Sequence, residues 1–80
     1  MKQIQVRYYA ILREQAGKSE EALTTSAASP SALFDELKLR YPFTLSAQQL
    51  KVAINAEFRE WHTPLQDGDS VVFIPPVAGG

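Results

Sequence analysis

One segment of the chain, "SPSALFDELKLRYP", carries a full set of helix signals and limits the fold to one main helix. Ser29 is a typical N-cap, Pro30 suits the first helical position, and Pro42 cannot continue the helix. The apolar residues recur at helical spacing and form one stripe: Leu33, Phe34, Leu37 and Tyr41. A helix with a single apolar stripe must bury it, and we expect it to pack on a sheet.

The first strand of that sheet is predicted from strict alternation over residues 3–9. One face would carry Ile4, Val6 and Tyr8, and the other Gln3, Gln5, Arg7 and Tyr9. Good helix formers follow over 10–16 and stop at Gly17, which predicts a short helical turn capped by that glycine. A second strand is predicted over 20–25, and the short connection implies that it pairs closely with the first.

The second half of the chain predicts the remaining strands. Residues 52–55 read as a short buried strand, 57–61 as another extended piece, and 70–74 as a β-branched and aromatic strand. Turns are expected at Asn55-Ala56 and over 67–69. This order predicts a single α+β domain over residues 1–74, with a mixed sheet packed on one main helix, and an extended tail over residues 75–80 ending in Gly-Gly.

Composition excludes several classes of function. The hydrophobic content of 45% is that of a globular domain, and a net charge of -1 offers no basic field for nucleic acid. The chain has no cysteine and one histidine, so no metal site is expected. No segment approaches the length of a signal peptide core or a membrane span, and we expect a cytoplasmic protein without membrane contact.

The final residues, "PPVAGG", have an unusual chemistry. Pro75-Pro76 favours an extended conformation, so residues 75–80 could span roughly 20 Å and enter another protein. We expect this insertion to involve Pro75, Pro76, Val77, Ala78 and Gly79. The glycines fit a channel too narrow for side chains, and the reactive group at Gly80 would be its α-carboxylate. A carboxylate must be activated, for example as an acyl-adenylate, and this chain has no residues for that step, which indicates a carrier charged by another enzyme.

A docking surface is predicted beside the tail. Tyr9 falls on the outward face of the first strand, and if Phe73 points inward, Val72 and Ile74 point outward. Parallel pairing of the first and last strands would bring these three side chains together as a partner-docking patch. The alternative is that they are scattered exposed apolar residues.

Other polar residues are interpreted as structural. His62 is expected to be a surface loop residue without a role, and Asp67 and Asp69 to be turn residues, since a calcium loop needs further oxygen ligands. Arg13-Glu14 either solvates a helical turn or forms a docking pair.

Three pieces of the sequence, "VRYYAILREQAG", "VAIN" and "LQDGDSVVFIPPVAGG", carry a resemblance that covers essentially the whole chain. Together they resemble the MoaD/ThiS sulfur-carrier family, which has the ubiquitin-like β-grasp fold. One departure is Ala56, where a tight Asn-Gly turn would be the easier choice.

The resemblance implies a role as the non-catalytic sulfur donor of a transferase complex, molybdopterin synthase. Gly80 would be adenylated by a ubiquitin-activating-like adenylyltransferase that uses ATP, and then converted to a thiocarboxylate. In a pocket of the large, catalytic subunit the sulfur would pass to a cyclic pterin precursor and form the dithiolene of molybdopterin. The resemblance further implies a heterotetramer with the large subunit and no permanently bound cofactor.

Other functions stay open from the sequence. "REWH" is similar to the sulfur carriers of thiamin thiazole synthesis. A ubiquitin-like modifier joined through Gly80 to lysines is a further alternative, and a plain β-grasp interaction module is the last.

Overall fold

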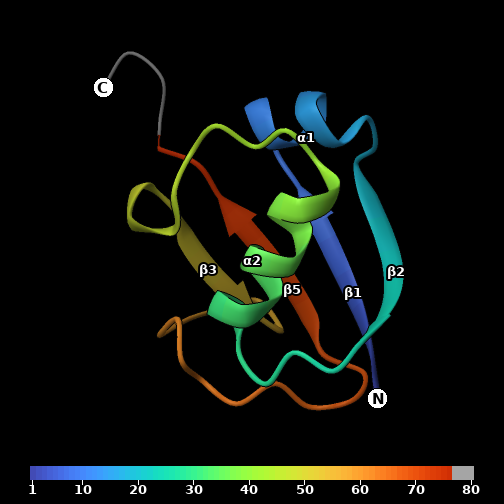
Figure 1. Cartoon of the computed structure of the whole chain (residues 1–80). Helices are drawn as coiled ribbons and strands as arrows, with labels where there is room; N and C mark the ends of the chain where they lie inside the picture. Colours follow the sequence, from blue (N-terminus) through green and yellow to red (C-terminus); the bar gives the residue numbers. More distant parts are fainter. Residues whose placement is uncertain (77–80) are drawn as a thin grey trace.

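The computed structural model describes residues 1–76, which form a single five-stranded sheet crossed by one main helix (Figure 1). The strand order is β2-β1-β5-β3-β4. The central strands β1 and β5 are parallel, and the other neighbouring strands are antiparallel. The bounds are β1 Lys2–Tyr8, β2 Glu20–Thr25, β3 Lys51–Ile54, β4 Glu57–Arg59 and β5 Ser70–Ile74. This is the predicted α+β, β-grasp arrangement, including the parallel pairing of the first and last strands.

The main helix α2, Pro30–Arg40, lies across one face of the sheet (Figure 1). Its start is capped as predicted, because the Ser29 hydroxyl accepts a hydrogen bond from the Ala32 N–H at 3.2 Å. The short helix α1, Ile11–Ala16, ends at Gly17, whose φ of 77° places it in the left-handed region. The predicted glycine cap of this helical turn is therefore confirmed.

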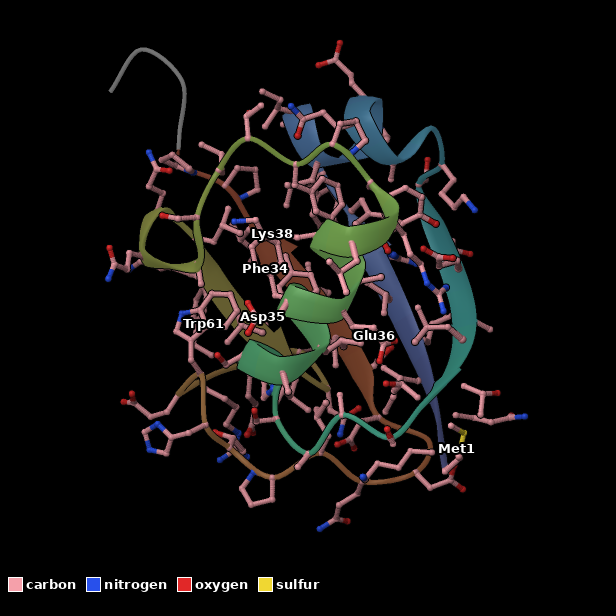
Figure 2. The ribbon with its side chains drawn as sticks, in the orientation of Figure 1. Met1, Phe34, Asp35, Glu36, Lys38 and Trp61 are labelled. Atoms are coloured by element: carbon pink, nitrogen blue, oxygen red, sulfur yellow. The ribbon has the colours of Figure 1, made fainter. Side chains whose placement is uncertain are left out.

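The core lies between α2 and the face of the sheet that it covers, here called the covered face. Phe34 of α2 stacks on Phe43 with ring centroids 5.7 Å apart and contacts Phe73 of β5 at 5.2 Å. Trp61 stacks on Phe73 at 5.8 Å and closes the side of this aromatic group (Figure 2). The other face of the sheet is here called the open face, and no helix of residues 1–76 lies over it (Figure 1).

The structure differs from the sequence prediction mainly between α2 and β3. A 3₁₀ helix, η1 Ala47–Gln49, lies in this connection, and Phe43 and Leu50 on either side of it are buried in the core. The strands also end slightly earlier than expected: β1 stops at Tyr8 and β4 at Arg59. Trp61 therefore follows β4 and is held by its packing on the core rather than by the sheet.

Candidate functional site

The predicted tail begins at the end of the central strand. β5 ends at Ile74, Pro75 is partly buried and Pro76 is exposed. Because β5 is parallel to β1, the chain leaves the sheet beside the C-terminal end of β1, at the same end of the molecule as the end of α2. The remaining predicted tail residues, Val77, Ala78, Gly79 and Gly80, lie outside the described residues, and their role in insertion and activation stays a prediction.

The three predicted docking residues lie together on the open face beside this exit point. In the parallel pairing Val72 is opposite Arg7, and in the antiparallel pairing Ile74 is opposite Lys51. Tyr9, 44% exposed, follows the end of β1. The three side chains line one shallow concavity of about 510 Å³, together with Ala53 and Phe58. We call Tyr9, Ala53, Phe58, Val72 and Ile74 the open-face patch.

Phe58 was not singled out from the sequence, although it is the most exposed aromatic residue of the patch at 70%. It lies on the short edge strand β4, opposite Ala53 of β3, where it faces the same side as Val72. In the sequence Phe58 stands between the charged residues Glu57 and Arg59. This alternation was the available sign that Phe58 points to the opposite side of the strand from its neighbours. An aromatic ring exposed to this extent on a sheet face is typical of a contact surface.

A strained turn holds Tyr9 at the corner of the open face. The Leu12 N–H donates to the Tyr9 carbonyl at 3.1 Å, which closes a tight turn through Ala10. Ala10 has φ 51° and ψ -127°, a conformation that a residue with a Cβ rarely adopts and that costs about 1–3 kcal/mol. Burial of Tyr8 and Leu12 on either side of the turn enforces it.

A carboxylate joins three elements at the same end of the molecule. Glu21 Oε2 on β2 accepts hydrogen bonds from the Tyr8 hydroxyl at 2.5 Å and from the Tyr41 hydroxyl at 2.8 Å. Burial opposes ionisation of Glu21, but the two phenol donors and the nearby Lys18 outweigh it and lower the pKa of its carboxyl. Burial, and then the bond to Glu21, raise the pKa of Tyr8. Sequence reasoning missed this cluster, because its members are far apart in the chain.

The two aspartates interpreted as turn residues both accept hydrogen bonds from nearby backbone or side-chain donors. Asp67 accepts a hydrogen bond from the Gln3 N–H at 2.7 Å, and Asp69 accepts from Asn55 Nδ2 at 2.9 Å and from the Gln66 N–H at 2.8 Å, so both organise turns. His62 is exposed in the loop after β4.

Within residues 1–76 no cluster of potential metal ligands is present, and no helix is long and apolar enough to cross a membrane.

Comparison with known proteins gives consistent results. The model of the ThiS family matches residues 6–80. The molybdopterin synthase sulfur carrier subunit of Mycobacterium tuberculosis is 34% identical, with 100% of both chains covered. The protein of the same description from Escherichia coli K12 is 31% identical, with 96% of this chain and 99% of that protein covered.

Solved structures agree with these relatives. A Pyrococcus furiosus protein proposed to be subunit 1 of a molybdopterin converting factor superposes with a TM-score of 0.80, at 29% identity over 96% of this chain and all of that one. The complex of subunits 1 and 2 of the molybdopterin-converting factor from Helicobacter pylori gives a TM-score of 0.68 at 23% identity, with 98% of this chain and 99% of the matched chain covered, and supports the fold. The sequence match and the observed β-grasp architecture together show that this chain belongs to the ThiS family.

Proposed function

We propose that this chain is the sulfur carrier subunit of a molybdopterin synthase. The observation that carries the proposal is the similarity, over the full length of both chains, to the sulfur carrier subunit of M. tuberculosis. The family match extends to residue 80, so the Gly-Gly sequence lies inside the matched region. The E. coli relative has the same description, which favours molybdopterin synthesis over the thiamin pathway.

The proposed chemistry takes place at Gly80. Its carboxylate attacks the α-phosphorus of ATP on a separate adenylyltransferase, and pyrophosphate leaves. A sulfur nucleophile at the oxidation level of sulfide, such as hydrosulfide, then attacks the acyl carbon and expels AMP, which leaves a thiocarboxylate. The thiocarboxylate sulfur bonds to the cyclic pterin precursor on the large subunit, and water then hydrolyses the acyl–sulfur bond, which leaves the sulfur on the pterin and restores the carboxylate of Gly80. The carrier needs no permanently bound cofactor for these steps, since ATP is used only during activation.

Docking on the large subunit would combine the tail with the open-face patch. The patch lies directly beside the point where the chain leaves β5, so one partner surface could contact the patch while a channel in the partner receives residues 75–80. Apolar contact at Tyr9 and Ile74 would anchor the complex, and the tail would bring Gly80 to the reacting centre. The resulting complex is proposed to be a heterotetramer.

Mass spectrometry of the protein purified from its own cells tests the proposal. A fraction whose terminal residue has one oxygen replaced by sulfur is the expected result. Isopeptide adducts through Gly80 to lysines would instead favour a protein modifier. An unmodified terminus in cells that are making molybdopterin would contradict a carrier role of either kind.

Two variants test the position of the reacting group. Deletion of Gly80 leaves a terminal carboxylate on Gly79 but withdraws it by about 3.5 Å, and an alanine added after Gly80 displaces it outward. Misplacement on the scale of an ångström can cost ~100-fold in rate, so dithiolene formation with the large subunit and the activating enzyme should collapse in both. Near-normal product formation by either variant would overturn the assignment of Gly80. A control, Gly79→Val, should fold normally but should be adenylated slowly, because its side chain adds bulk inside the channel.

A further inference from the structure

The side-chain charges are unevenly distributed along the molecule, although the net charge is only -1. At the end where the chain leaves β5, two ion pairs each contribute no net charge: Arg7 with Glu20 at 3.0 Å, and Lys18 with Glu21 at 3.7 Å. Four further cations are exposed at this end and form no ion pair with any described carboxylate: Arg13, Lys38, Arg40 and Lys51. We call these four residues the basic rim.

The basic rim lies at the same end of the molecule as the base of the tail. Lys51 begins β3 and is paired with Ile74, the last residue of β5. Lys38 and Arg40 lie in the last turn of α2. Figure 2 shows Lys38 on the half of α2 that is nearer to the tail. Arg13 lies on α1, which a hydrogen bond of 3.0 Å from Gln15 to Thr44 joins to the loop after α2. On these elements the described acidic residues outside an ion pair are Glu14 on α1 and Asp35 and Glu36 on α2. Asp35 and Glu36 precede the last turn of α2, and Glu36 accepts a hydrogen bond from the Thr25 hydroxyl at the end of β2 away from the tail.

The opposite end of the molecule is acidic. Asp67 is exposed on the loop that leads into β5, and Asp69 lies beside it. The Gly68 N–H donates to the Gln3 carbonyl at 2.8 Å, which places this loop beside the start of β1, far from the tail. Lys2 also lies at this end, and its Nζ donates to the Ala27 carbonyl at 3.3 Å.

We propose that the basic rim steers the tail end of this protein onto an acidic protein surface surrounding the channel that receives the tail. A tail that must thread a narrow channel needs a long-lived and correctly oriented encounter. Positive charge at the leading end and negative charge at the trailing end align the molecule as it approaches an acidic partner. The apolar patch then provides the short-range contact. The inference rests on the proposed function, in which the tail enters the large subunit.

The basic rim is expected to act on the rate of association with the large subunit. Charge-guided association is fast at low ionic strength and falls steeply with salt, since the Debye length shrinks from about 30 Å at 0.01 M to about 10 Å at 0.1 M. The dissociation rate should respond much less, because the rim residues lie around the contact rather than at its centre.

The test measures association of the full chain with the large subunit by stopped flow at about 0.01 M and about 0.5 M salt. Arg13→Glu and Lys38→Glu are the test variants, singly and combined, because neither residue belongs to the open-face patch. Lys2→Glu is the matched control, with the same change of charge at the far end. The combined variant should associate at least about 10-fold more slowly at low salt, and this difference should vanish at high salt. Lys2→Glu should associate within about twofold of the wild type.

The possible failures are distinguishable. If the wild-type chain does not bind the large subunit at all, the proposed function fails. If the wild type binds but the combined variant associates equally fast at low salt, or faster, the steering inference alone is wrong. Arg13→Gln and Lys38→Gln guard against misfolding: neutralisation should give an intermediate rate, with melting temperature and circular dichroism unchanged.

Discussion

The two faces of the sheet use the same strands for different purposes. On the covered face, Val6, Tyr8, Val71 and Phe73 are each at most 1% exposed and pack beneath α2. One residue away along the same strands, Arg7 and Val72 point to the open face and line its concavity. Strand parity alone separates the two sets. Stability should therefore depend on the covered face, while the open face can carry a binding surface with little effect on folding.

Two neighbouring glutamates show the same contrast for polar residues. Glu20 points to the open face, where its ion pair with Arg7 is exposed to solvent, with half or more of each side chain accessible. Glu21 points to the covered side and accepts hydrogen bonds from two tyrosines. Burial strengthens the hydrogen bonds of Glu21, whereas solvent weakens the ion pair between Glu20 and Arg7.

The largest expected effect comes from comparing two phenylalanines on opposite faces. Phe73→Ala removes a fully buried ring that contacts Phe34 and Trp61, and should reduce the free energy of unfolding by about 3–5 kcal/mol. Phe58→Ala removes a ring that is 70% exposed, and should change the free energy of unfolding by no more than about 0.5 kcal/mol. Urea unfolding of both variants measures the difference. Equal losses would mean that the open face also supports the fold.

Substitutions on the open face should affect binding to the large subunit more than they affect folding. The double variant Tyr9→Ala/Ile74→Asp removes an aromatic anchor and places a charge within the open-face patch. It should weaken binding to the large subunit by about 2–3 kcal/mol while leaving most of the fold intact. Calorimetry measures the dissociation constant, and urea unfolding serves as the control. Undiminished binding would leave the tail as the sole anchor.

The sequence predicted the two faces well because alternation is a local signal. Ile4, Val6 and Tyr8 could be assigned to the core, and Val72 and Ile74 to the opposite side, without knowing what covers either face. Capping residues predicted α2 in the same way, since Ser29 and Pro30 act on adjacent backbone groups.

The connection after α2 was not predicted, for reasons that are partly non-local. Phe43 and Leu50 are buried by contacts with distant elements, and only the complete fold brings these together. A local signal was available for η1, because Ser46 and Gln49 form a capping box. The Tyr8–Glu21–Tyr41 cluster had no local signal, since it joins β1, β2 and the end of α2.

The two glutamates give the next comparison. Glu21→Gln should reduce the free energy of unfolding by about 1–2 kcal/mol at pH 7, because one amide oxygen must replace a carboxylate that accepts from two phenols. Glu20→Gln should change it by less than about 0.5 kcal/mol. Thermal unfolding of both variants in the same buffer checks the contrast. A larger loss in Glu20→Gln would reverse the assignment of the buried contact.

Glu21 gives the stability of the protein a pH dependence of known sign. The folded state lowers the pKa of Glu21 below its ordinary value of 4.5, so the stabilisation is present above that value and is lost as the pH falls through the folded pKa. From about pH 5 to pH 3 the wild type and Glu20→Gln should therefore lose more stability than Glu21→Gln does. Parallel curves for all three proteins would contradict the assigned role of this carboxylate.

The smallest effect is expected at the hairpin between β3 and β4, on the rim of the open face. Its two central residues, Asn55 and Ala56, have φ values of 53° and 70°, the pattern of a type I′ turn. Asn55 tolerates this conformation and its side chain is bonded, donating to Asp69 Oδ1 and accepting from the Ser70 N–H at 3.0 Å. Ala56 is strained, because its Cβ crowds the backbone in the left-handed region.

Ala56→Gly should therefore stabilise the protein. Relief of about 1–2 kcal/mol of strain is partly offset by the greater freedom of glycine in the unfolded chain, which leaves a gain of about 0.5–1 kcal/mol. Asn55→Gly at the neighbouring position is the matched control and should destabilise, because it loses both side-chain hydrogen bonds and relieves little strain. Binding to the large subunit should be unchanged in Ala56→Gly, since the open-face patch keeps its apolar side chains. If Ala56→Gly melts below the wild type, the alanine makes a stabilising contact that outweighs its backbone strain.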